Sequence, residues 1–510
     1  MLEPYRVLDL TNGRGELAGF MLAQLGAEVI SIEPVGGSSS RNIAPFRGGE
    51  SSGDSLYFSA FGRGQASVEL DLAGSENDRA QLKELAKGAD VIIESSDVGE
   101  MAAMGLGYDD LAAVNPALVY ASISPFGQTG PKATWAATDL TIWAAAGPSR
   151  ITGDSDRAPL RMQCDQSFAH AAAEAAGCVI AALYERAGSG HGQHVDISAQ
   201  QASTQATQSM ILAHPNGDTM LKREAGGIKF GDVFLQLLWP CANGHVSITF
   251  LFGTALGVPT GRLMEVVCEQ GYCDEATRDR DWISYGEELL TGVEPVEEYD
   301  RIKACVGKFC MAHTKAELLE LAMTHNLLIA SVNMMDDVIG LDQFVERDFW
   351  DDVEGDRFPG PMIKASGTPL PRLSAAPALG ADTLRVLSEP CRTPSAPELV
   401  TPAPTARPLE GVKILDFMWV MAGPAGTRVL ADMGATVVRI ESNARIDTAR
   451  TLQPFKDNTN SLGSSALFSN MNAGKLGVTI NPTTPEGMAV IEDLIRWADV
   501  VTESYSPRAM

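Results

Sequence analysis

Short apolar runs alternate with amphipathic segments over residues 1–205 of the chain. Short apolar runs bounded by turn residues are typical of buried strands, and apolar residues repeated every three to four positions indicate helices. Strands that alternate with helices predict a doubly wound parallel sheet, so we expect a large Rossmann-like α/β domain here. The predicted strands are Val7–Leu10, Val29–Ile32, Val91–Glu94 and Val119–Ile123, and the predicted helices are Glu16–Leu25, Glu76–Lys87, Tyr108–Val114 and Ala169–Arg186.

The pattern changes after the last of these helices and the strand that follows it. The stretch 234–250, FLQLLWPCANGHVSITF, predicts a hairpin, and mixed helical patterns come after it, so we expect a smaller α+β domain at 225–330. We expect the chain to return to the larger domain with the helix Lys315–Thr324 and over residues 331–387. Residues 388–408 hold six prolines without apolar periodicity, which is typical of an extended linker.

The opening pattern recurs near the end of the chain. Leu25–Glu33 aligns with Met433–Glu441, and further matches follow at nearly constant spacing. We therefore interpret residues 1–387 (the first segment) and 409–510 (the second segment) as tandem copies of one unit. The pattern stops partway through the second segment, so we expect a fragment of a longer two-copy protein.

The first predicted βα turn carries Gly13, Gly15 and Gly19, and Glu33 ends the following strand. A dinucleotide-binding turn has the spacing GxGxxG, whereas the last interval here is one residue longer. The second segment has Met418–Met421 in the same turn, without a glycine. We therefore favour a structural βαβ unit, and an NAD(P) enzyme is the alternative that nicotinamide binding would identify.

The formal net charge of the chain is -26. A strongly acidic surface repels nucleic acid and anionic lipid, so we expect neither nucleic acid nor a membrane as a partner. A small anionic ligand is compatible with this charge, because a few local Arg, Lys or backbone N–H groups suffice to bind it. No continuous apolar run reaches the roughly 18 residues of a membrane span, and the opening MLEPYRVLDL lacks the regions of a signal peptide. We therefore expect a cytoplasmic protein.

The eight cysteines include no CxxC pair. Cys305, Cys310 and His313 lie close in the sequence, but positions i and i+5 of a helix point to different faces. We therefore expect reduced, mostly buried thiols and no metal site.

Four stretches carry a more specific pattern: 415–441, Gly105–Pro131, Ala181–Ala202 and Ala376–Leu387. Together they resemble the class III CoA-transferase (CaiB/BaiF) family, at its opening, between two central strands, after its catalytic residue and in its C-terminal signature. The resemblance implies an interlocked fold in which a large Rossmann-like domain carries a smaller α+β domain. It also implies a ring-like homodimer, or a pairing of the two segments within one chain.

The resemblance implies a chemistry as well. The family moves coenzyme A between carboxylic acids, so acyl-CoA and a free acid are the expected partners, with CoA as a substrate and no permanently bound cofactor. An aspartate attacks the thioester carbonyl and forms a mixed anhydride. The released CoA thiolate converts this anhydride to an aspartyl-CoA thioester, which the acceptor acid then attacks. Such a site must exclude water and offer hydrogen-bond donors to the oxyanion.

Asp165 is the carboxylate that precedes the long helix of the first segment, where the family has its nucleophile. Counted back from Leu183, it lies a few residues farther than the family's spacing, and an ungapped match falls near Phe168. Three interpretations stay open: Asp165 is the nucleophile, the first segment has lost its nucleophile, or Asp165 only caps the helix. No matching aspartate precedes Met510 in the second segment, so we expect little or no transferase activity from this fragment.

The family binds CoA at its first βα turn and at nearby basic residues. In the first segment Gln65 replaces Lys475, and Asp97 stands near a position where the family often has an arginine, so this segment is expected to bind CoA poorly. The expected CoA-binding residues are Val420, Met421, Ala422, Arg450 and Lys475 in the second segment and Asn12, Gly13, Arg14 and Arg41 in the first, with Gly226 and Gly227 as a mobile glycine loop or a plain turn.

His170 and Glu174 lie four residues apart on the long predicted helix. We favour a buried, satisfied His–Glu pair over a general base at these positions. Relatives with this fold racemise α-methylacyl-CoA with an aspartate and a histidine, so a racemase is one alternative function. A non-catalytic scaffold that binds CoA or forms dimers is another. The sequence does not predict which acids are exchanged.

Overall fold

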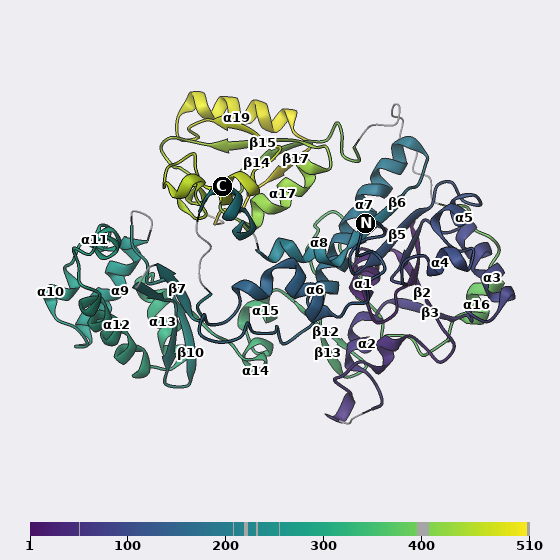
Figure 1. Cartoon of the computed structure of the whole chain (residues 1–510), viewed down its shortest axis with the longest axis horizontal. Coiled ribbons are helices and arrows are strands. Elements are labelled where there is room, and N and C mark those ends of the chain that lie inside the picture. The colour runs from purple at the N-terminus through teal and green to yellow at the C-terminus, as the bar shows by residue number, and fades with distance from the viewer. Residues whose placement is uncertain are drawn as a thin grey trace. The chain divides into compact units, whose positions relative to one another are not determined.

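The computed structural model describes residues 1–49, 52–207, 209–218, 223–230, 233–253, 256–394 and 407–506 of the chain (Figure 1). These residues form two units. The first contains Met1–Pro148, Met162–Leu212 and Glu346–Met510, and the second contains Ser149–Arg161 and Ala213–Val345. Most of the expected linker, residues 395–406, lies outside the described residues.

A six-stranded sheet forms the centre of the first segment. Every neighbouring pair of strands is parallel, and the strand order is β3-β2-β1-β4-β5-β6. This is the order of a doubly wound Rossmann sheet, with its crossover point between β1 and β4. The sheet confirms the fold class that the alternating pattern predicts. Its strands are β1 (Arg6–Leu10), β2 (Glu28–Glu33), β3 (Gln65–Glu69), β4 (Val91–Glu94), β5 (Val119–Ser124) and β6 (His194–Ser198).

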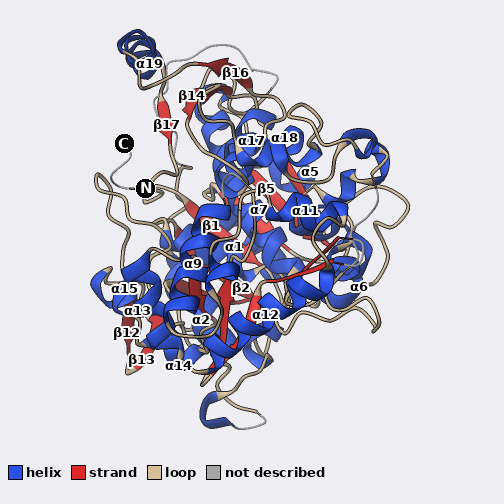
Figure 2. Cartoon of the chain, turned by 90° about the vertical axis from the view of Figure 1, so that its left-hand side faces the viewer, coloured by secondary structure: helices blue, strands red, loops and turns tan. Residues whose placement is uncertain are grey.

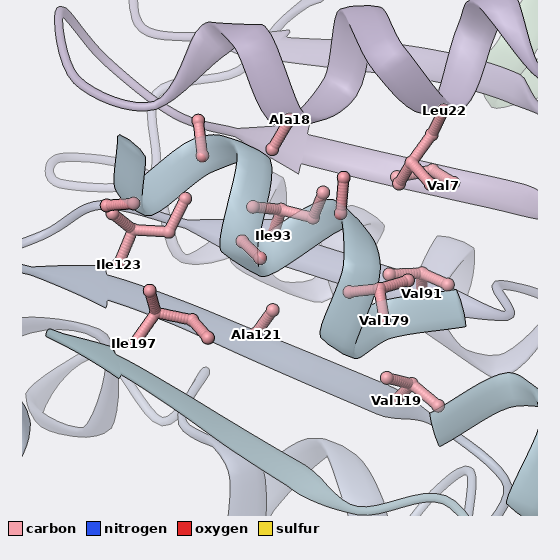
Figure 3. Packing of buried hydrophobic residues seen from close by; sticks show 14 of the residues in the cluster. Val7, Ala18, Leu22, Val91, Ile93, Val119, Ala121, Ile123, Val179 and Ile197 are labelled. Atoms are coloured by element: carbon pink, nitrogen blue, oxygen red, sulfur yellow. The ribbon is translucent and has the colours of Figure 1, made fainter. Parts of the chain in front are cut away.

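Helices cover both faces of this sheet because successive strand residues point to opposite sides. Val7 packs toward α1 (Glu16–Gln24) and α7 (Ser167–Ser189), and Figure 3 shows Ala18, Leu22 and Val179 of these helices against the strands. Leu8 belongs to the core on the other face. The remaining helices of the first segment are α2 (Leu56–Phe61), α3 (Glu76–Lys87), α4 (Glu100–Ala103), α5 (Tyr108–Ala112), α6 (Asp139–Ala146), α8 (Ala199–Thr204) and α16 (Thr383–Ser388).

Helix α7 is long and apolar enough, by length and composition, to cross a membrane, and half of its apolar window is buried in the protein. Its sequence is not a continuous apolar run, because His170 and Glu174 interrupt it. Ala171, Ala175 and Val179 are fully buried on the sheet. The helix is therefore packed as a core helix of the α/β domain.

The second unit contains a three-stranded antiparallel sheet of order β11-β10-β9 and a separate β7–β8 hairpin. Helices pack around a core that includes Trp239, Phe250 and Tyr299. The elements are β7 (Gly227–Phe230), β8 (Val233–Gln236), β9 (Leu238–Cys241), β10 (Gly244–Ile248), α9 (Gly257–Glu269), α10 (Glu275–Arg278), α11 (Tyr285–Thr291), α12 (Val296–Met311), α13 (Lys315–His325), β11 (Ile329–Ser331) and α14 (Met335–Ile339).

Helix α13 corrects the expected course of the chain. The sequence pattern predicts that Lys315–Thr324 and the residues from 331 onward lie in the larger domain, but α13 belongs to the second unit, and the chain leaves this unit only at Glu346. The reason is burial, because Leu318 and Ala322 of α13 pack into the core of the second unit. After Glu346, which ends α15 (Asp342–Glu346), the strands β12 (Trp350–Val353) and β13 (Asp356–Pro359) pair as a hairpin (Figure 2).

The cysteines are less buried than the sequence predicts: two are buried (Cys241 and Cys310), four are partly exposed (Cys178, Cys268, Cys273 and Cys305) and two are exposed (Cys164 and Cys391). Cys310 is buried, and His313 Nδ1 forms a hydrogen bond with the Phe309 carbonyl at 2.8 Å. Within the described ranges, no group of three or more His, Cys, Asp or Glu side chains is arranged to hold a metal ion.

The second segment builds a four-stranded parallel sheet of order β16-β15-β14-β17. This order repeats β3-β2-β1-β4 of the first segment strand for strand. The register repeats as well, since Asp9 lies between Ser31 and Ile93, and Asp416 lies between Arg439 and Thr502. The elements are β14 (Lys413–Asp416), α17 (Ala422–Asp432), β15 (Thr436–Glu441), α18 (Ala466–Met471), β16 (Leu476–Thr479), α19 (Pro485–Trp497) and β17 (Val500–Thr502).

Candidate functional site

A cavity of about 480 Å³ lies at the carboxyl ends of β1, β2, β3 and β4 in the first segment. Ligands of open α/β sheets bind at this edge, next to the point where the strand order reverses. Asn12, Gly13 and Arg14 of the first βα turn line the cavity, as do Asp97 and Glu100 after β4. The structure therefore places three of the sequence-predicted binding residues at the edge where a ligand is expected.

The glycines of the first βα turn have structural reasons to be there. Gly13 has φ +72° and Gly15 has φ +89°, which L side chains rarely adopt. A Cβ on Gly13 would also lie 2.3 Å from the Ser39 hydroxyl oxygen. Asn12 stabilises the turn by accepting a hydrogen bond from the Ser39 backbone N–H at 2.7 Å. These constraints explain the glycines without a dinucleotide.

The same turn in the second segment is strained. Val420 aligns with Gly13 and has φ +66°, a left-handed conformation that is costly for a β-branched residue. Its backbone N–H donates to Asp447 at 3.2 Å, which holds the turn in this conformation. Strained residues of this kind occur at many ligand sites, and the role of the Val420, Met421 and Ala422 turn in CoA binding stays a prediction.

Acidic side chains dominate the cavity of the first segment. Asp71, Asp97 and Glu100 line it, while Arg14 is its basic residue near the βα turn. The Arg14 guanidinium lies 3.5 Å from the Asp97 carboxylate and 5.5 Å from the centre of the Phe168 ring. A phosphate in this cavity would meet more negative than positive charge, which opposes binding.

Arg41 and Arg450 occupy equivalent positions and make the same contacts. Arg41 donates to Glu33 at 2.6 and 2.7 Å and lies 3.8 Å from the Phe58 ring centre. Arg450 donates to Glu441 through Nε and Nη2, each at 2.8 Å, and its guanidinium lies 3.6 Å from the ring centre of Phe468. Bidentate pairs of this kind fix the guanidinium plane. The two predicted phosphate ligands thus each anchor the loop after the second strand of their sheet.

These arginines also lower the pKa values of the glutamates at the ends of the second strands, Glu33 and Glu441. Burial alone would raise the pKa of Glu441, but the hydrogen bonds from Arg450 and the nearby charge of Arg439 hold this pKa at about 2. Burial likewise opposes ionisation of Glu33, and the Arg41 hydrogen bonds keep its pKa below the ordinary value. Both carboxylates are therefore ionised partners of a structural ion pair.

Lys475 lies inside the second segment rather than at a ligand surface. Its side chain is only 2% exposed, and its ammonium donates to Asp416 at 3.0 Å, Thr427 at 2.8 Å and the Pro424 carbonyl at 3.0 Å. An ammonium has three protons, so these contacts use its donors fully. Burial lowers the pKa of Lys475, and the Asp416 carboxylate opposes this shift. The structure therefore gives Lys475 a structural position.

Gly226 and Gly227 form a turn of the second unit. Gly226 has φ +75°, and its carbonyl accepts hydrogen bonds from the backbone N–H groups of Leu237 at 2.8 Å and Leu238 at 2.9 Å. Gly227 begins β7, where a Cβ would lie 2.3 Å from the Leu235 carbonyl oxygen. Close backbone approach therefore accounts for this glycine pair.

The contacts at the start of helix α7 show whether Asp165, the candidate nucleophile, caps this helix. Asp165 is exposed directly before the helix, but the N-cap is Gln166 and makes no side-chain cap bond. Instead the Ser167 backbone N–H donates to the Asp139 carboxylate at 2.6 Å. No local sequence pattern indicates Asp139 as the capping residue, because it lies on a different helix, α6. Phe168, at the position of the ungapped match, packs against the core with its ring near Arg14.

The expected His170–Glu174 pair does not form. Among the described residues no hydrogen bond joins these two side chains, and the ring of His170 lies 5.7 Å from that of Trp143 instead. Burial lowers the pKa of His170 against the opposing charge of Asp139, and burial raises the pKa of Glu174. Both shifts favour the neutral forms, which need no ion pair.

An aromatic and basic cluster at the carboxyl edge of the second sheet was not predicted. The Arg445 guanidinium lies 5.1 Å from the Trp419 ring centre and 6.0 Å from the Tyr505 ring centre. Aromatic rings beside a guanidinium suit a purine base and a phosphate. The first segment has Asn12 and Ser96 at the positions of Trp419 and Tyr505. The three residues come from separate loops, so no local motif indicates them.

Comparison with known proteins assigns the chain to a family. The sequence model of CoA-transferase family III matches residues 2–383 and 409–510. A probable CoA-transferase of Mycobacterium tuberculosis is 27% identical over 98% of this chain, which spans 61% of that protein's length. The succinyl-CoA:(R)-benzylsuccinate CoA-transferase subunit BbsE of Thauera aromatica is 31% identical over 68% of this chain and 82% of its own.

The fold agrees with this assignment. A crystal structure of a CaiB/BaiF family protein from Brucella suis matches 76% of this chain and 98% of its own, with a TM-score of 0.65 and 24% identity. The family match covers residues 2–383 and 409–510, and the sheets of these two stretches share the order of four strands. The chain therefore belongs to CoA-transferase family III.

Proposed function

We propose that the protein is an acyl-CoA:carboxylate CoA-transferase made of duplicated segments, in which the second segment binds CoA and the first is degenerate. Family membership supports the reaction class. Relatives named for succinate and benzylsuccinate, for acetate and oxalate and for succinate and glutarate share the transfer of CoA between two acids. Their substrates differ, so the pair of acids for this protein is left open.

The proposed reaction passes through an aspartyl-CoA thioester. A carboxylate attacks the acyl-CoA carbonyl, the C–S bond breaks, and CoA leaves as a thiolate while a mixed anhydride forms. The thiolate then attacks the aspartyl carbonyl of the anhydride, releasing the first acid and leaving aspartyl-CoA. The acceptor acid repeats the two steps in reverse and takes the CoA. No net proton or electron is consumed.

The proposal that the first segment is degenerate rests on Phe168, a residue at the start of α7. The ungapped spacing places the phenyl ring of Phe168, which cannot act as a nucleophile, where the family has a carboxylate. Asp165 is exposed to solvent, and a solvated carboxylate is a weak nucleophile. The acidic lining of the neighbouring cavity opposes a CoA phosphate as well.

The second segment has the features that a CoA site needs. Its βα turn is strained at Val420, and Arg445 lies beside the rings of Trp419 and Tyr505 at the same edge of the sheet. The first segment has Asn12 and Ser96 in place of the two rings, and a glycine (Gly36 or Gly37) in place of Arg445. These differences support CoA binding in the second segment.

Calorimetric titration of CoA into the chain tests this assignment. Arg445→Ala should weaken CoA binding by roughly ten- to a hundredfold, because a charge-assisted contact to phosphate contributes roughly 1.5–3 kcal/mol. Arg14→Ala is the matched control at the edge of the first sheet, and it should leave the affinity unchanged. The reverse pattern, with binding lost only in Arg14→Ala, would overturn the assignment.

An exchange assay tests the degeneracy separately. The chain is incubated with an acyl-CoA and a labelled free acid, and hydroxylamine is added to trap any acyl-enzyme or CoA-ester adduct. We expect little exchange and no trapped adduct at Asp165. Robust exchange that Asp165→Ala abolishes would show instead that the first segment is catalytic.

A further inference from the structure

The two sheets bury one aspartate at the same place, Asp9 in β1 and Asp416 in β14. Asp9 is 3% exposed and Asp416 is fully buried. Each accepts a hydrogen bond of 2.9 Å from the backbone N–H two residues later, Thr11 or Met418. The aspartates therefore have the same backbone environment, and their side-chain partners can be compared position by position.

In the second segment, three side chains donate hydrogen bonds to the Asp416 carboxylate. Lys475 donates to it at 3.0 Å, and the hydroxyls of Thr427 and Thr502 donate at 2.7 and 3.1 Å. A buried carboxylate with a cation and several hydrogen-bond donors is compensated.

In the first segment, Gly19, Gln65 and Ile93 replace these three partners. Gln65 donates its amide N–H to the Phe61 carbonyl at 3.0 Å instead of to Asp9. A Cβ on Gly19 would lie 2.0 Å from an Asp9 carboxylate oxygen, so the aspartate fills the place of the lost threonine. Over the part of the chain that the structure describes, no cationic side chain forms an ion pair with Asp9.

The balance of charged side chains around the buried aspartate differs between the segments. The second segment balances three carboxylates (Asp416, Glu441 and Asp447) with three cations (Arg439, Arg450 and Lys475). The first segment has Ser31 and Ser38 at the positions of Arg439 and Asp447, and it adds Glu16. Three carboxylates (Asp9, Glu16 and Glu33) then stand beside one cation, Arg41.

A small cavity lies where the two cationic side chains are missing. Its volume is about 10 Å³, and Asp9, Glu16, Tyr57 and Gln65 line it together with serine hydroxyls. Glu16 is 8% exposed, and one of its oxygens accepts from the Tyr57 hydroxyl at 3.2 Å. The other oxygen, Oε1, is buried without a hydrogen-bond partner. The cavity thus has room for one water-sized particle and an unsatisfied anionic ligand atom.

We propose that this cavity binds one monovalent cation of the size of potassium or ammonium, which takes the role of the Lys475 ammonium in the other segment. The ligands would be carboxylate oxygens of Asp9 and Glu16 and hydroxyl oxygens of the lining. A divalent ion prefers six or more oxygens or retained water, for which this volume is too small. The site is independent of the CoA site proposed above.

The pKa shifts of the two carboxylates agree with a site that has, among the described residues, no cationic side chain beside them. Burial raises the pKa of Asp9 to about 7, with Glu16 and Glu33 adding to the shift while the Thr11 hydrogen bonds lower it. Burial also raises the pKa of Glu16, and nearby backbone N–H groups offset part of this effect.

Thermal unfolding of the full chain in different chloride salts tests the proposal. At equal ionic strength and pH 8, potassium or ammonium chloride should raise Tm by a few degrees relative to tetramethylammonium chloride, because the larger cation does not fit the cavity. Equal Tm values in the three salts would overturn the proposal, since general screening does not distinguish the cations.

Two variants locate the effect. Gln65→Lys supplies the missing ammonium at the position of Lys475, so it should raise Tm in tetramethylammonium chloride and remove the further increase with potassium. Glu16→Gln keeps the shape of the side chain but removes a charged ligand, so it should also lose the potassium increment. If either folded variant keeps the full increment, the cation binds elsewhere and the proposal is wrong.

Discussion

A buried aspartate costs free energy unless its charge is compensated, and Asp9 and Asp416 meet this cost differently. Asp416 has the Lys475 ammonium and two threonine hydroxyls. Asp9 keeps the backbone N–H of Thr11, while Glu16 and Glu33 add negative charge nearby. Its pKa of about 7 is the expected consequence, because a proton is the most available compensation in the absence of a cation.

This shift predicts how stability depends on pH. The folded-state pKa of about 7 exceeds the ordinary aspartate value of 3.8, so the folded protein binds this proton more tightly than the unfolded chain. The stabilisation is complete below about pH 4 and is lost as the pH rises through 7. Relative to Asp9→Asn, the wild type should lose up to about 1.4 kcal/mol of unfolding free energy per pH unit over this interval.

Urea denaturation in tetramethylammonium buffers at several pH values measures this difference. The comparison with Asp9→Asn removes the contribution of other carboxylates, such as Glu441, whose low pKa acts in the opposite direction. Parallel pH profiles for the two proteins would contradict the raised pKa of Asp9.

At the scale of elements, the start of α7 depends on a contact between two helices. Asp139 is the first residue of α6, and its carboxylate accepts from the Ser167 backbone N–H at 2.6 Å. The Ser167 hydroxyl donates in return to the Asp139 carbonyl at 3.1 Å. These reciprocal bonds fix the place where the chain enters α7 and thereby the position of Phe168.

Removal of this cap should destabilise the protein measurably. Asp139→Ala is expected to cost about 1 kcal/mol of unfolding free energy, as loss of an N-cap acceptor does elsewhere, whereas Asp139→Asn keeps an acceptor and should cost less. Asp165→Ala is the control and should stay within about 0.5 kcal/mol, because Asp165 is exposed. Urea denaturation checks all three, and a larger loss for Asp165→Ala would restore Asp165 as the cap.

The elements themselves could be predicted well where the pattern is periodic. The strand Val91–Glu94 and the helix Glu76–Lys87 have the predicted bounds, because a short continuous apolar run indicates a buried parallel strand and a polar segment with spaced apolar residues indicates a helix. The place of α13 could not be predicted, since its buried Leu318 and Ala322 would suit either core. The cluster around Arg445 was missed because its members meet only after three loops fold onto one sheet edge.

For the whole molecule, the main consequence is that two sheets with the same strand order carry different side chains at their carboxyl edges. Residues 1–387 and 409–510 share a strand order, and a buried aspartate and a Glu–Arg pair recur in both. The first segment replaces the aromatic and basic edge with polar and acidic residues. A repeated strand order therefore does not imply a repeated site, because the sheet sets the position of the edge and the loops set its chemistry.

The stoichiometry of CoA binding tests this asymmetry. We expect calorimetry of the full chain to give one CoA per chain, because the acidic lining beside Arg14 disfavours a second phosphate-bearing ligand. Asp97→Asn removes one of the opposing charges and frees Arg14 from its ion pair, so weak binding of a second CoA should appear in this variant. Two CoA molecules bound with equal affinity by the wild type would show that both edges still bind ligand, and that the acidic residues lie too far from the phosphates to discriminate between the segments.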